Sequence, residues 1–213
     1  MNMLPVNKIK DFVRIKPSGS TSRTKFGGQP DWLGIPQWPL SREAGTPMKF
    51  IGQIDLSDPV YREFNIDPKM AYIFMTEEDE FIDETFLYDG GENAVIIQPD
   101  GTNEYVIINN QSTGPTHSAK EYFPTFTGEL LQPPYSDDSS YDEVVDFLYG
   151  HGHLGGYPCF IQGEEYPGNP DDWFLLAQMD GGLPFEVNFG DDGNGYVFMH
   201  KNGRQGAFLW QCH

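Results

Sequence analysis

The sequence contains few cysteines. Cys159 and Cys212 are the only two among 213 residues, and no Cys-x-x-Cys pair or ladder of spacings accompanies them. The pattern does not indicate a disulfide framework, and both residues are expected to be free thiols. A nucleophilic cysteine needs a nearby base and electropositive surroundings, whereas the flanking sequence here is acidic. Packing is therefore the expected role of Cys159.

Long hydrophobic runs are also missing. Residues 1–12 carry Lys8 and Lys10 but no continuous apolar stretch. A secretory signal needs such a stretch and a membrane anchor needs a longer one. The sequence therefore favours a cytosolic protein.

Several catalytic signatures are absent as well. The chain has no Gly-x-Ser-x-Gly nucleophile elbow, no phosphate-binding Gly-x4-Gly-Lys-[Ser/Thr] and no metal-binding His-Glu-x-x-His. Carboxylates are abundant, but a glycosidase pair is defined by its placement and not by the number of acids. A non-enzymatic role is favoured without excluding catalysis, and neither a cofactor nor a metal site is expected.

Basic residues are scarce over most of the chain. The formal net charge is −19, and residues 70–200 hold 25 Asp and Glu against the single basic residue Lys120. Residues 1–25 reverse this balance, with six basic residues and only Asp11 as an acid. A field of this sign repels nucleic acid and anionic membranes and attracts basic proteins or divalent cations. The alternative is that the charge serves solubility alone.

Glycine, proline and aromatic residues are plentiful, and some of them recur in one order. A Gly-Gly-x-Pro segment, a strand glutamine and a strand tyrosine occur at 27–30, Gln53 and Tyr72, and again at 155–158, Gln178 and Tyr196. The second glycine precedes the glutamine by 25 residues in one copy and by 22 in the other. Two copies are too few for a solenoid. We expect one α+β domain over residues 1–213, mainly antiparallel β, with pseudo-two-fold halves at about 12–110 and 139–213.

Local patterns predict short strands joined by turns. Apolar and β-branched runs predict strands at 12–15, 50–56, 71–75, 173–179, 185–189, 196–199 and 207–211. A Pro-Asp-Gly turn predicts a hairpin between residues 93–98 and 104–109, and another hairpin is expected between 185–189 and 196–199. Serines followed by acids and an apolar face predict a helix over residues 141–149.

The strongest candidate site residues are the two Gln-x-Asp pairs, Gln53 with Asp55 and Gln178 with Asp180. Residues two apart on a strand share a face, so each pair would place an amide beside a carboxylate. The pairs could together bind a cation, a polyol or an amine in a groove between the halves. The alternative, which we favour, is that each glutamine satisfies backbone groups of its own Gly-Gly-x-Pro loop.

Other candidates are weaker. His153, in the segment His151-Gly152-His153, is more often a turn histidine than a zinc ligand, since a zinc site needs three or four protein ligands. Trp38 and Trp173 are candidates for the groove wall. The Asp191-Asp192 turn lacks the ligand spacing of a calcium loop.

Together these segments resemble the YwqG-like family, a bacterial-type domain of unassigned function. The resemblance runs from about Phe12 to Gln211 and rests on five motifs. These are Gly27 to Pro30 with Trp38-Pro39, Gln53 to Leu56, His153 to Pro158, Leu175 to Gln178, and Gly190-Asp191 with the following glycines. The resemblance implies a fold without an established activity, and some members sit in bacterial toxin and immunity systems. We therefore expect a non-enzymatic acidic protein that binds a basic protein partner, as an immunity protein does. A small-ligand or enzymatic role in a groove between the repeats is the alternative.

Overall fold

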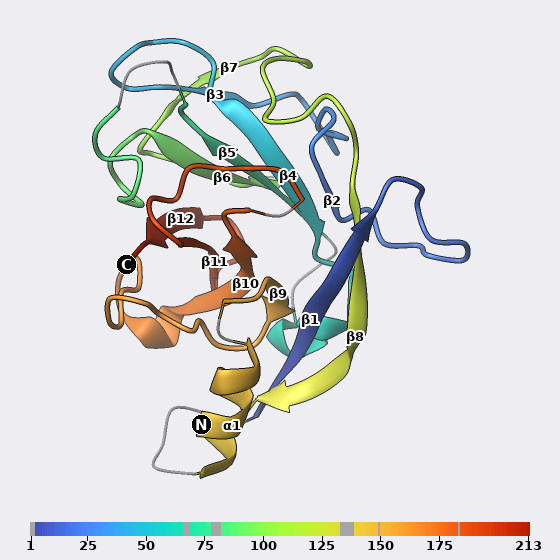
Figure 1. Ribbon diagram of the computed structural model, residues 1–213. Coiled ribbons are helices and arrows are strands. Elements are labelled where there is room, and N and C mark those ends of the chain that lie inside the picture. The colour runs from blue at the N-terminus through green and yellow to red at the C-terminus, as the bar shows by residue number, and fades with distance from the viewer. Residues whose placement is uncertain (1–2, 66–68, 78–81, 133–138, 149, 183) are drawn as a thin grey trace.

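The computed structural model is built mainly from antiparallel strands in two sheets, with few helices (Figure 1). It describes residues 3–65, 69–77, 82–132, 139–148, 150–182 and 184–213. The expected antiparallel character is confirmed, and the α component is one α-helix and two short 3-10 turns among the described residues.

The elements follow one another in chain order. They are β1 (Leu4–Val13), β2 (Lys25–Phe26), β3 (Trp38–Leu40), β4 (Lys49–Asp55), η1 (Pro59–Phe64), β5 (Met70–Met75), β6 (Asn93–Gln98), β7 (Ile107–Asn109), β8 (Phe123–Gln132), α1 (Ser139–Leu148), β9 (His153–Gly155), η2 (Pro170–Asp172), β10 (Trp173–Asp180), β11 (Asn194–His200) and β12 (Gly206–Gln211).

The larger sheet has six strands in the order β12-β11-β10-β9-β1-β8, and the smaller has four in the order β2-β4-β5-β6. A two-stranded ladder of β3 and β7 lies beside the smaller sheet (Figure 1). Every ladder between named strands is antiparallel. β1 places the N-terminal segment between two strands from later in the chain, because it pairs with β8 on one side and with β9 on the other.

The main core lies between the two sheets, and the strands are buried on their outer faces too. In β5 the side chains of Ala71 and Ile73 enter the main core, whereas Tyr72 and Phe74 enter a second cluster under β3 and β7. This alternation follows the two-residue period of a strand. Burying one large apolar side chain such as Phe74, which is 0% exposed, contributes about 1.5–3 kcal/mol.

Several predicted strands are confirmed with small shifts, but the opening strand and both hairpins are wrong. β1 starts eight residues before the predicted strand at 12–15 and ends at Val13. β7 pairs with β3 and not with β6. The chain leaves β6 toward the C-terminal region, where Thr102 N donates to Arg204 O at 2.8 Å, so the Pro-Asp-Gly turn does not return it to the same sheet.

In place of the second predicted hairpin, β11 pairs with β10, and residues 185–189 form no strand. Val187 N donates to Gly181 O at 2.8 Å, which folds this segment back over the connection. The predicted helix is confirmed as α1, although residue 149 falls outside the described residues. No helix in the described parts of the chain is long and apolar enough to cross a membrane.

Candidate functional site

Gln53 holds the loop that follows the first Gly-Gly-x-Pro segment. It is 0% exposed, its Oε1 accepts the N–H of Asp31 at 2.8 Å, and its Nε2 donates to Arg23 O at 2.9 Å. Nε2 also lies 3.3 Å from Asp31 Oδ2. Leaving a buried amide unsatisfied costs about 1–3 kcal/mol, so these bonds are needed for folding. They leave the amide little capacity for a ligand.

Gln178 holds the second loop with the same geometry. It too is 0% exposed, and its Oε1 accepts the N–H of Cys159 at 2.9 Å. Its Nε2 donates to His151 O at 3.4 Å. Cys159 directly follows its Gly-Gly-x-Pro segment, as Asp31 follows the first.

Two tyrosines donate hydrogen bonds to the carbonyl oxygens of the same loop residues, Asp31 and Cys159. Tyr72 faces Gln53 across the β4–β5 ladder, and its hydroxyl donates to Asp31 O at 2.8 Å. Tyr196 faces Gln178 across the β10–β11 ladder, and its hydroxyl donates to Cys159 O at 2.9 Å.

A third strand in each sheet contributes a second glutamine, which the sequence reasoning missed. Gln98 Oε1 accepts the N–H groups of Leu33 and Gly34, each at 3.1 Å, and its Nε2 donates to Ile35 O at 2.8 Å. We call Gln53, Tyr72 and Gln98 the first brace.

Gln211 makes the matching set of bonds. Its Oε1 accepts the N–H groups of Ile161 and Gln162, each at 3.0 Å, and its Nε2 donates to Gly163 O at 3.1 Å. We call Gln178, Tyr196 and Gln211 the second brace. The sequence signal that could have identified Gln211 is its position as a polar residue at the end of the apolar strand β12.

The two aspartates of the candidate pairs also bind nearby backbone. Asp55 Oδ2 accepts the N–H of Arg23 at 2.8 Å, and its Oδ1 accepts the N–H of Ser57 at 3.0 Å. Asp180 Oδ1 accepts the N–H of Gly182 at 2.7 Å.

The four candidates lie on two different sheets, Gln53 and Asp55 on β4 and Gln178 and Asp180 on β10. Among the described residues, no hydrogen bond joins one pair to the other. Their hydrogen bonds fit the backbone-binding alternative, and joint binding of one ligand stays a prediction.

The two candidate tryptophans differ in exposure. Trp38 is 0% exposed, and its Nε1 donates to Met48 O at 2.8 Å, so it is part of the core beneath β7. Trp173 is partly exposed and packs edge-on against His200, with ring centroids 5.2 Å apart.

His153 is buried in the larger sheet between Lys8 of β1 and Gln178 of β10. It is 0% exposed, and neither of its ring nitrogens has a hydrogen-bond partner in the described structure. Burial, with smaller contributions from the charges of Lys8 and His151, lowers the pKa of His153 to about 3. The ring is therefore neutral at pH 7. Among the described residues, no group of three His, Cys, Asp or Glu is placed to hold a metal ion.

Cys159 is buried, and its burial raises the pKa of the thiol to about 12. The thiolate is therefore disfavoured at neutral pH. This agrees with the packing role expected for Cys159.

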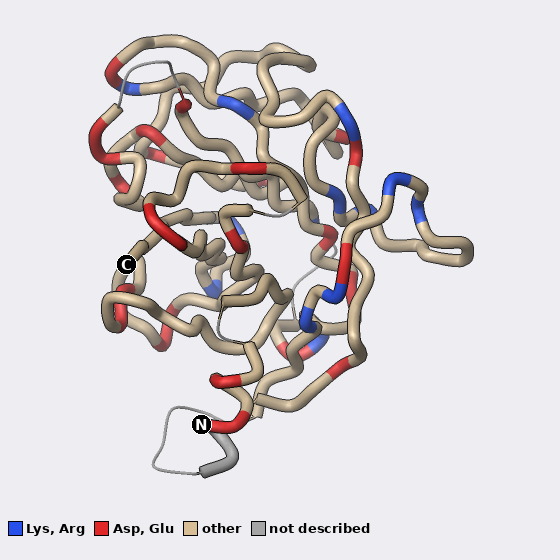
Figure 2. Tube along the Cα trace, viewed as in Figure 1, with Lys and Arg blue, Asp and Glu red and all other residues tan. Residues whose placement is uncertain are grey.

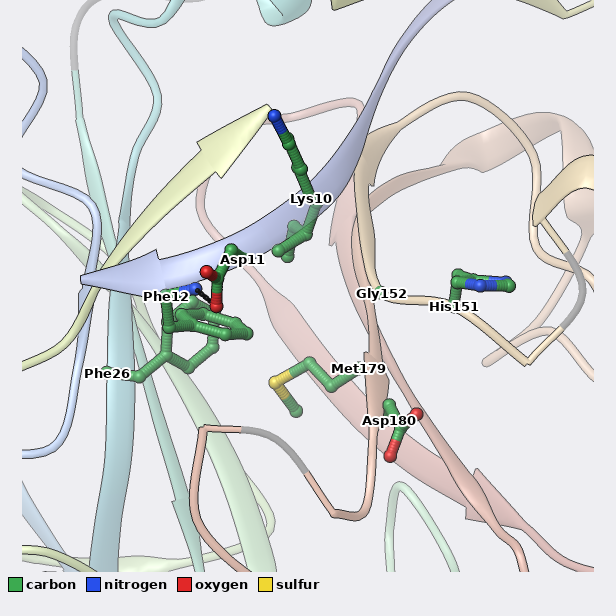
Figure 3. A pocket seen from close by; sticks show the side chains of 9 residues that line it. Lys10, Asp11, Phe12, Phe26, His151, Gly152, Met179 and Asp180 are labelled. Carbon is green, nitrogen blue, oxygen red and sulfur yellow. Dashed lines mark hydrogen bonds between the residues drawn. The ribbon is translucent and has the colours of Figure 1, made fainter. Parts of the chain in front are cut away.

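A small cavity opens where β1, β2 and the end of β10 meet (Figure 3). Its volume is about 100 Å³, and its apolar lining comes from Ile9, Phe12, Phe26 and Met179. Drug-sized pockets have about 300–1,000 Å³, so this cavity is sized for a single side chain or a small amine. Phe12 and Phe26 meet edge to face, with ring centroids 5.4 Å apart.

Two carboxylates border this cavity from opposite sides (Figure 3). Asp11 Oδ1 accepts the N–H of Phe12 at 2.7 Å, just as Asp180 Oδ1 accepts that of Gly182. The second oxygen of each carboxylate has no hydrogen-bond or ion-pair partner among the described residues. Lys10 and His151 also line the cavity, and the Lys10 side chain extends away from Asp180 in Figure 3. The rim therefore offers two carboxylate oxygens above an apolar floor.

On the side of Asp180 the cavity has further acidic neighbours, whereas basic residues lie on the side of β1. Asp180 borders a second, open hollow of about 580 Å³, whose lining includes Glu186 and Asp192. Figure 2 shows acids spread over the loops around the C-terminal strands, while basic residues gather along β1 and the loop after it. A cation approaching the cavity from the hollow would meet a negative field.

The sequence reasoning identified Asp180 but missed Asp11, Phe12, Phe26 and Met179 as its neighbours. These residues come from three distant strands, and no local pattern predicts that β1 lies beside β9.

Comparisons with known proteins place the chain in a family and give no activity. No curated protein matches it. The model of the family described as a domain of unknown function, DUF1963, matches residues 24–204. This range includes both braces except Gln211. The chain therefore belongs to the DUF1963 family.

Proposed function

We propose that the protein binds a basic protein partner without catalysis, and that one lysine or arginine side chain of the partner enters the cavity between the sheets. The observation that carries this proposal is the cavity rim, where Asp11 and Asp180 each keep one carboxylate oxygen unpartnered beside an apolar floor. The net charge of −19 supports the same choice of partner.

The chemistry of the cavity matches such a side chain. Lysine and arginine carry an apolar stem and a charged head, so a side chain that lies along the cavity would pack its stem on Phe12, Phe26 and Met179. Its head would then reach a carboxylate at the rim, and a cation near an aromatic face gains about 0.5–2 kcal/mol. The acidic field would raise the association rate more than the final affinity.

The finer assignments belong to this proposal. We assign the chain to the YwqG-like group on the motif order given above, and place its action in the cytosol. The partner we favour is a basic toxin that the protein neutralises. This choice is supported by the occurrence of some members of that group in toxin and immunity systems.

We also propose that the chain is an internal duplication. The two braces support it, since each takes a glutamine, a tyrosine and a second glutamine from three successive strands of one sheet. The glycines of the loops support it too, since Gly27, Gly28, Gly155 and Gly156 all have φ between 69° and 72°. Only glycine adopts this conformation without strain.

Affinity capture from lysate of the source cells tests the proposed function. We expect one basic protein in stoichiometric amount, lost as salt rises, and at least tenfold weaker binding to the double variant Asp11→Asn and Asp180→Asn. Both substitutions keep an oxygen acceptor for the backbone N–H and remove the charge. Glu143→Gln with Asp146→Asn on α1 is the matched control, because it removes two exposed charges elsewhere. Equal binding by both double variants would contradict the role of the cavity.

A second candidate function is the binding of a small organic amine in the same cavity, which its volume of about 100 Å³ favours. Thermal shift with a panel of aryl and alkyl amines tests it. Stabilisation that disappears in the double variant would support this candidate, and no stabilisation by any amine would remove it.

A further inference from the structure

A second groove, larger than the cavity and lined by aromatic residues, lies on the outer side of the second loop. Its volume is about 250 Å³. Tyr157, Tyr166 and Trp173 line it, together with Phe64, Pro158 and Leu175. This composition is typical of surfaces that bind extended, proline-containing peptides.

The matching place in the first half is filled by the chain itself. Gln29, Trp38 and Phe50 hold the positions in the first loop and β4 that Tyr157, Tyr166 and Leu175 hold in the second loop and β10. Residues 112–116 lie across those three residues. Gln29 exchanges two hydrogen bonds with Gly114, at 2.9 and 3.0 Å, and Phe50 N donates to Pro115 O at 2.9 Å.

In this closing segment Gly114 and Thr116 are partly buried, whereas Ser112, Thr113 and Pro115 are exposed. The segment reads Ser-Thr-Gly-Pro-Thr, and Thr116 forms a parallel bridge with Phe50 at the edge of β4. A Cβ atom on Gly114 would lie 2.8 Å from the Trp38 ring, so only glycine fits there. In the second half, no backbone hydrogen bond joins Leu175 to a segment outside its own sheet among the described residues.

Trp173 supplies a hydrogen-bond donor that the fold does not use. The indole N–H groups of Trp32 and Trp38 donate to Ser112 O and Met48 O, and that of Trp210 is buried without a partner. Among the described residues, the Trp173 N–H has no hydrogen-bond partner. Unlike the Trp210 N–H it is not buried, so solvent reaches it. It can donate to a carbonyl of a bound peptide.

The lining of the groove includes two acidic residues. Glu63 and Asp171 line it, are exposed, and have no ion-pair partner in the described part of the chain. A segment with basic residues on either side of its proline would complement this charge.

We infer that this groove binds an extended, glycine- and proline-containing segment with flanking basic residues from a partner protein, in the way that residues 112–116 fill the matching place in the first half. The inference rests on the proposed function, because it gives the basic partner a second contact and a sequence class. The peptide would run beside Leu175, contact Tyr166 and Trp173, and accept a hydrogen bond from the Trp173 indole.

The test uses the full chain and a fluorescent peptide that repeats residues 111–117 between two added lysines. We expect saturable binding by fluorescence anisotropy, at least tenfold weaker for Trp173→Ala and several-fold weaker for Trp173→Phe, which keeps a ring but loses the N–H. Glu63→Gln with Asp171→Asn should weaken binding and flatten its salt dependence, whereas the α1 control pair Glu143→Gln with Asp146→Asn should not. Circular dichroism confirms that each variant is folded.

Two results would overturn the inference. One is a peptide affinity that Trp173→Ala leaves unchanged, or that a proline-to-alanine peptide matches. The other is a groove-dependent dimer in sedimentation experiments, because the occupant would then be a second copy of the chain.

The same variants separate this inference from the proposed function. If Asp11→Asn with Asp180→Asn loses the captured basic protein while Trp173→Ala keeps both that protein and the peptide, the groove proposal alone fails. If the peptide binds through Trp173 but no basic protein is captured at any salt, the proposed function alone fails.

Discussion

The two loops that follow the Gly-Gly-x-Pro segments are held in the same way but covered differently. The first and second braces make matching hydrogen bonds to residues 31–35 and 159–163. Residues 112–116 then close the first loop, whereas the second borders an open aromatic groove. The recurring residues hold both loops in place, whereas the residues that differ leave the second loop uncovered in the described part of the chain.

The residues that face Gln53 and Gln178 on the neighbouring strands also differ, since one has partners and the other has none among the described residues. Lys25 faces Gln53, is 4% exposed, and pairs with Asp31 at 3.1 Å and with Glu121. His153 faces Gln178 and is buried with no hydrogen-bond partner in the described structure. A buried charge needs partners, and an unpartnered buried histidine stays neutral instead.

The largest expected effect comes from removing the second glutamine of either brace. Gln98→Ala and Gln211→Ala should each lower the free energy of unfolding by about 3 kcal/mol, because each leaves several loop backbone groups without a partner. Urea unfolding measures both. A large loss for one variant and none for the other would show that the braces are not equivalent.

A smaller effect concerns the pH dependence of stability at His153. Its pKa is about 3 when folded and about 6.5 when unfolded, so the unfolded chain binds a proton that the folded chain excludes. Stability from this site is complete above about pH 6.5 and declines as the pH falls toward 3, by about 2 kcal/mol between pH 7 and 5.

Substituting His153→Leu should remove that part of the pH dependence. Urea unfolding of both proteins at pH 7 and pH 5 measures it. An identical change between the two pH values in the variant would contradict this account of His153.

Loosening the closing segment, residues 112–116, should lower the free energy of unfolding by a smaller amount. Gln29→Ala removes both hydrogen bonds to Gly114 at a partly buried site, so a loss of about 1 kcal/mol is expected. Amide hydrogen exchange should show faster exchange at Gly114 in the variant. Unchanged exchange there would mean that other contacts hold the segment.

The smallest effect is chemical and leaves the fold intact. Cys212 is partly exposed, whereas Cys159 is buried with a pKa of about 12. At pH 8 we expect alkylation of one thiol per native chain, at Cys212, and of both thiols in denaturant. Mass spectrometry of the alkylated peptides reads this directly. Fast labelling of Cys159 in the native protein would refute its packing role.

Local features of the fold were predictable from the sequence where the pattern was strong. The apolar runs of β4, β5, β10 and β12 and the helix α1 were located correctly. The strand pairing was not, because β7 carries the β-branched pattern of a hairpin partner but pairs with β3. Tertiary packing decides such pairings, and local turn chemistry does not.

The candidate site was predictable only in part. The glutamines of the Gln-x-Asp pairs were found because they recur, and recurrence here marks residues that bind their own loops. Asp11 and Phe12 lie outside the recurring segments, and they reach the cavity because β1 pairs with β8 and β9. Nothing in a single sequence predicts that placement.

Residues 112–116 close the first loop, and we propose that a basic, proline-containing partner covers the second. Nuclear magnetic resonance of the four tryptophan indole N–H groups tests it most directly, during titration with the peptide that repeats residues 111–117 between two lysines. The account predicts that the Trp173 resonance moves with saturation while those of Trp32, Trp38 and Trp210 stay in place. A stationary Trp173 resonance, or an equal movement of all four, would contradict it.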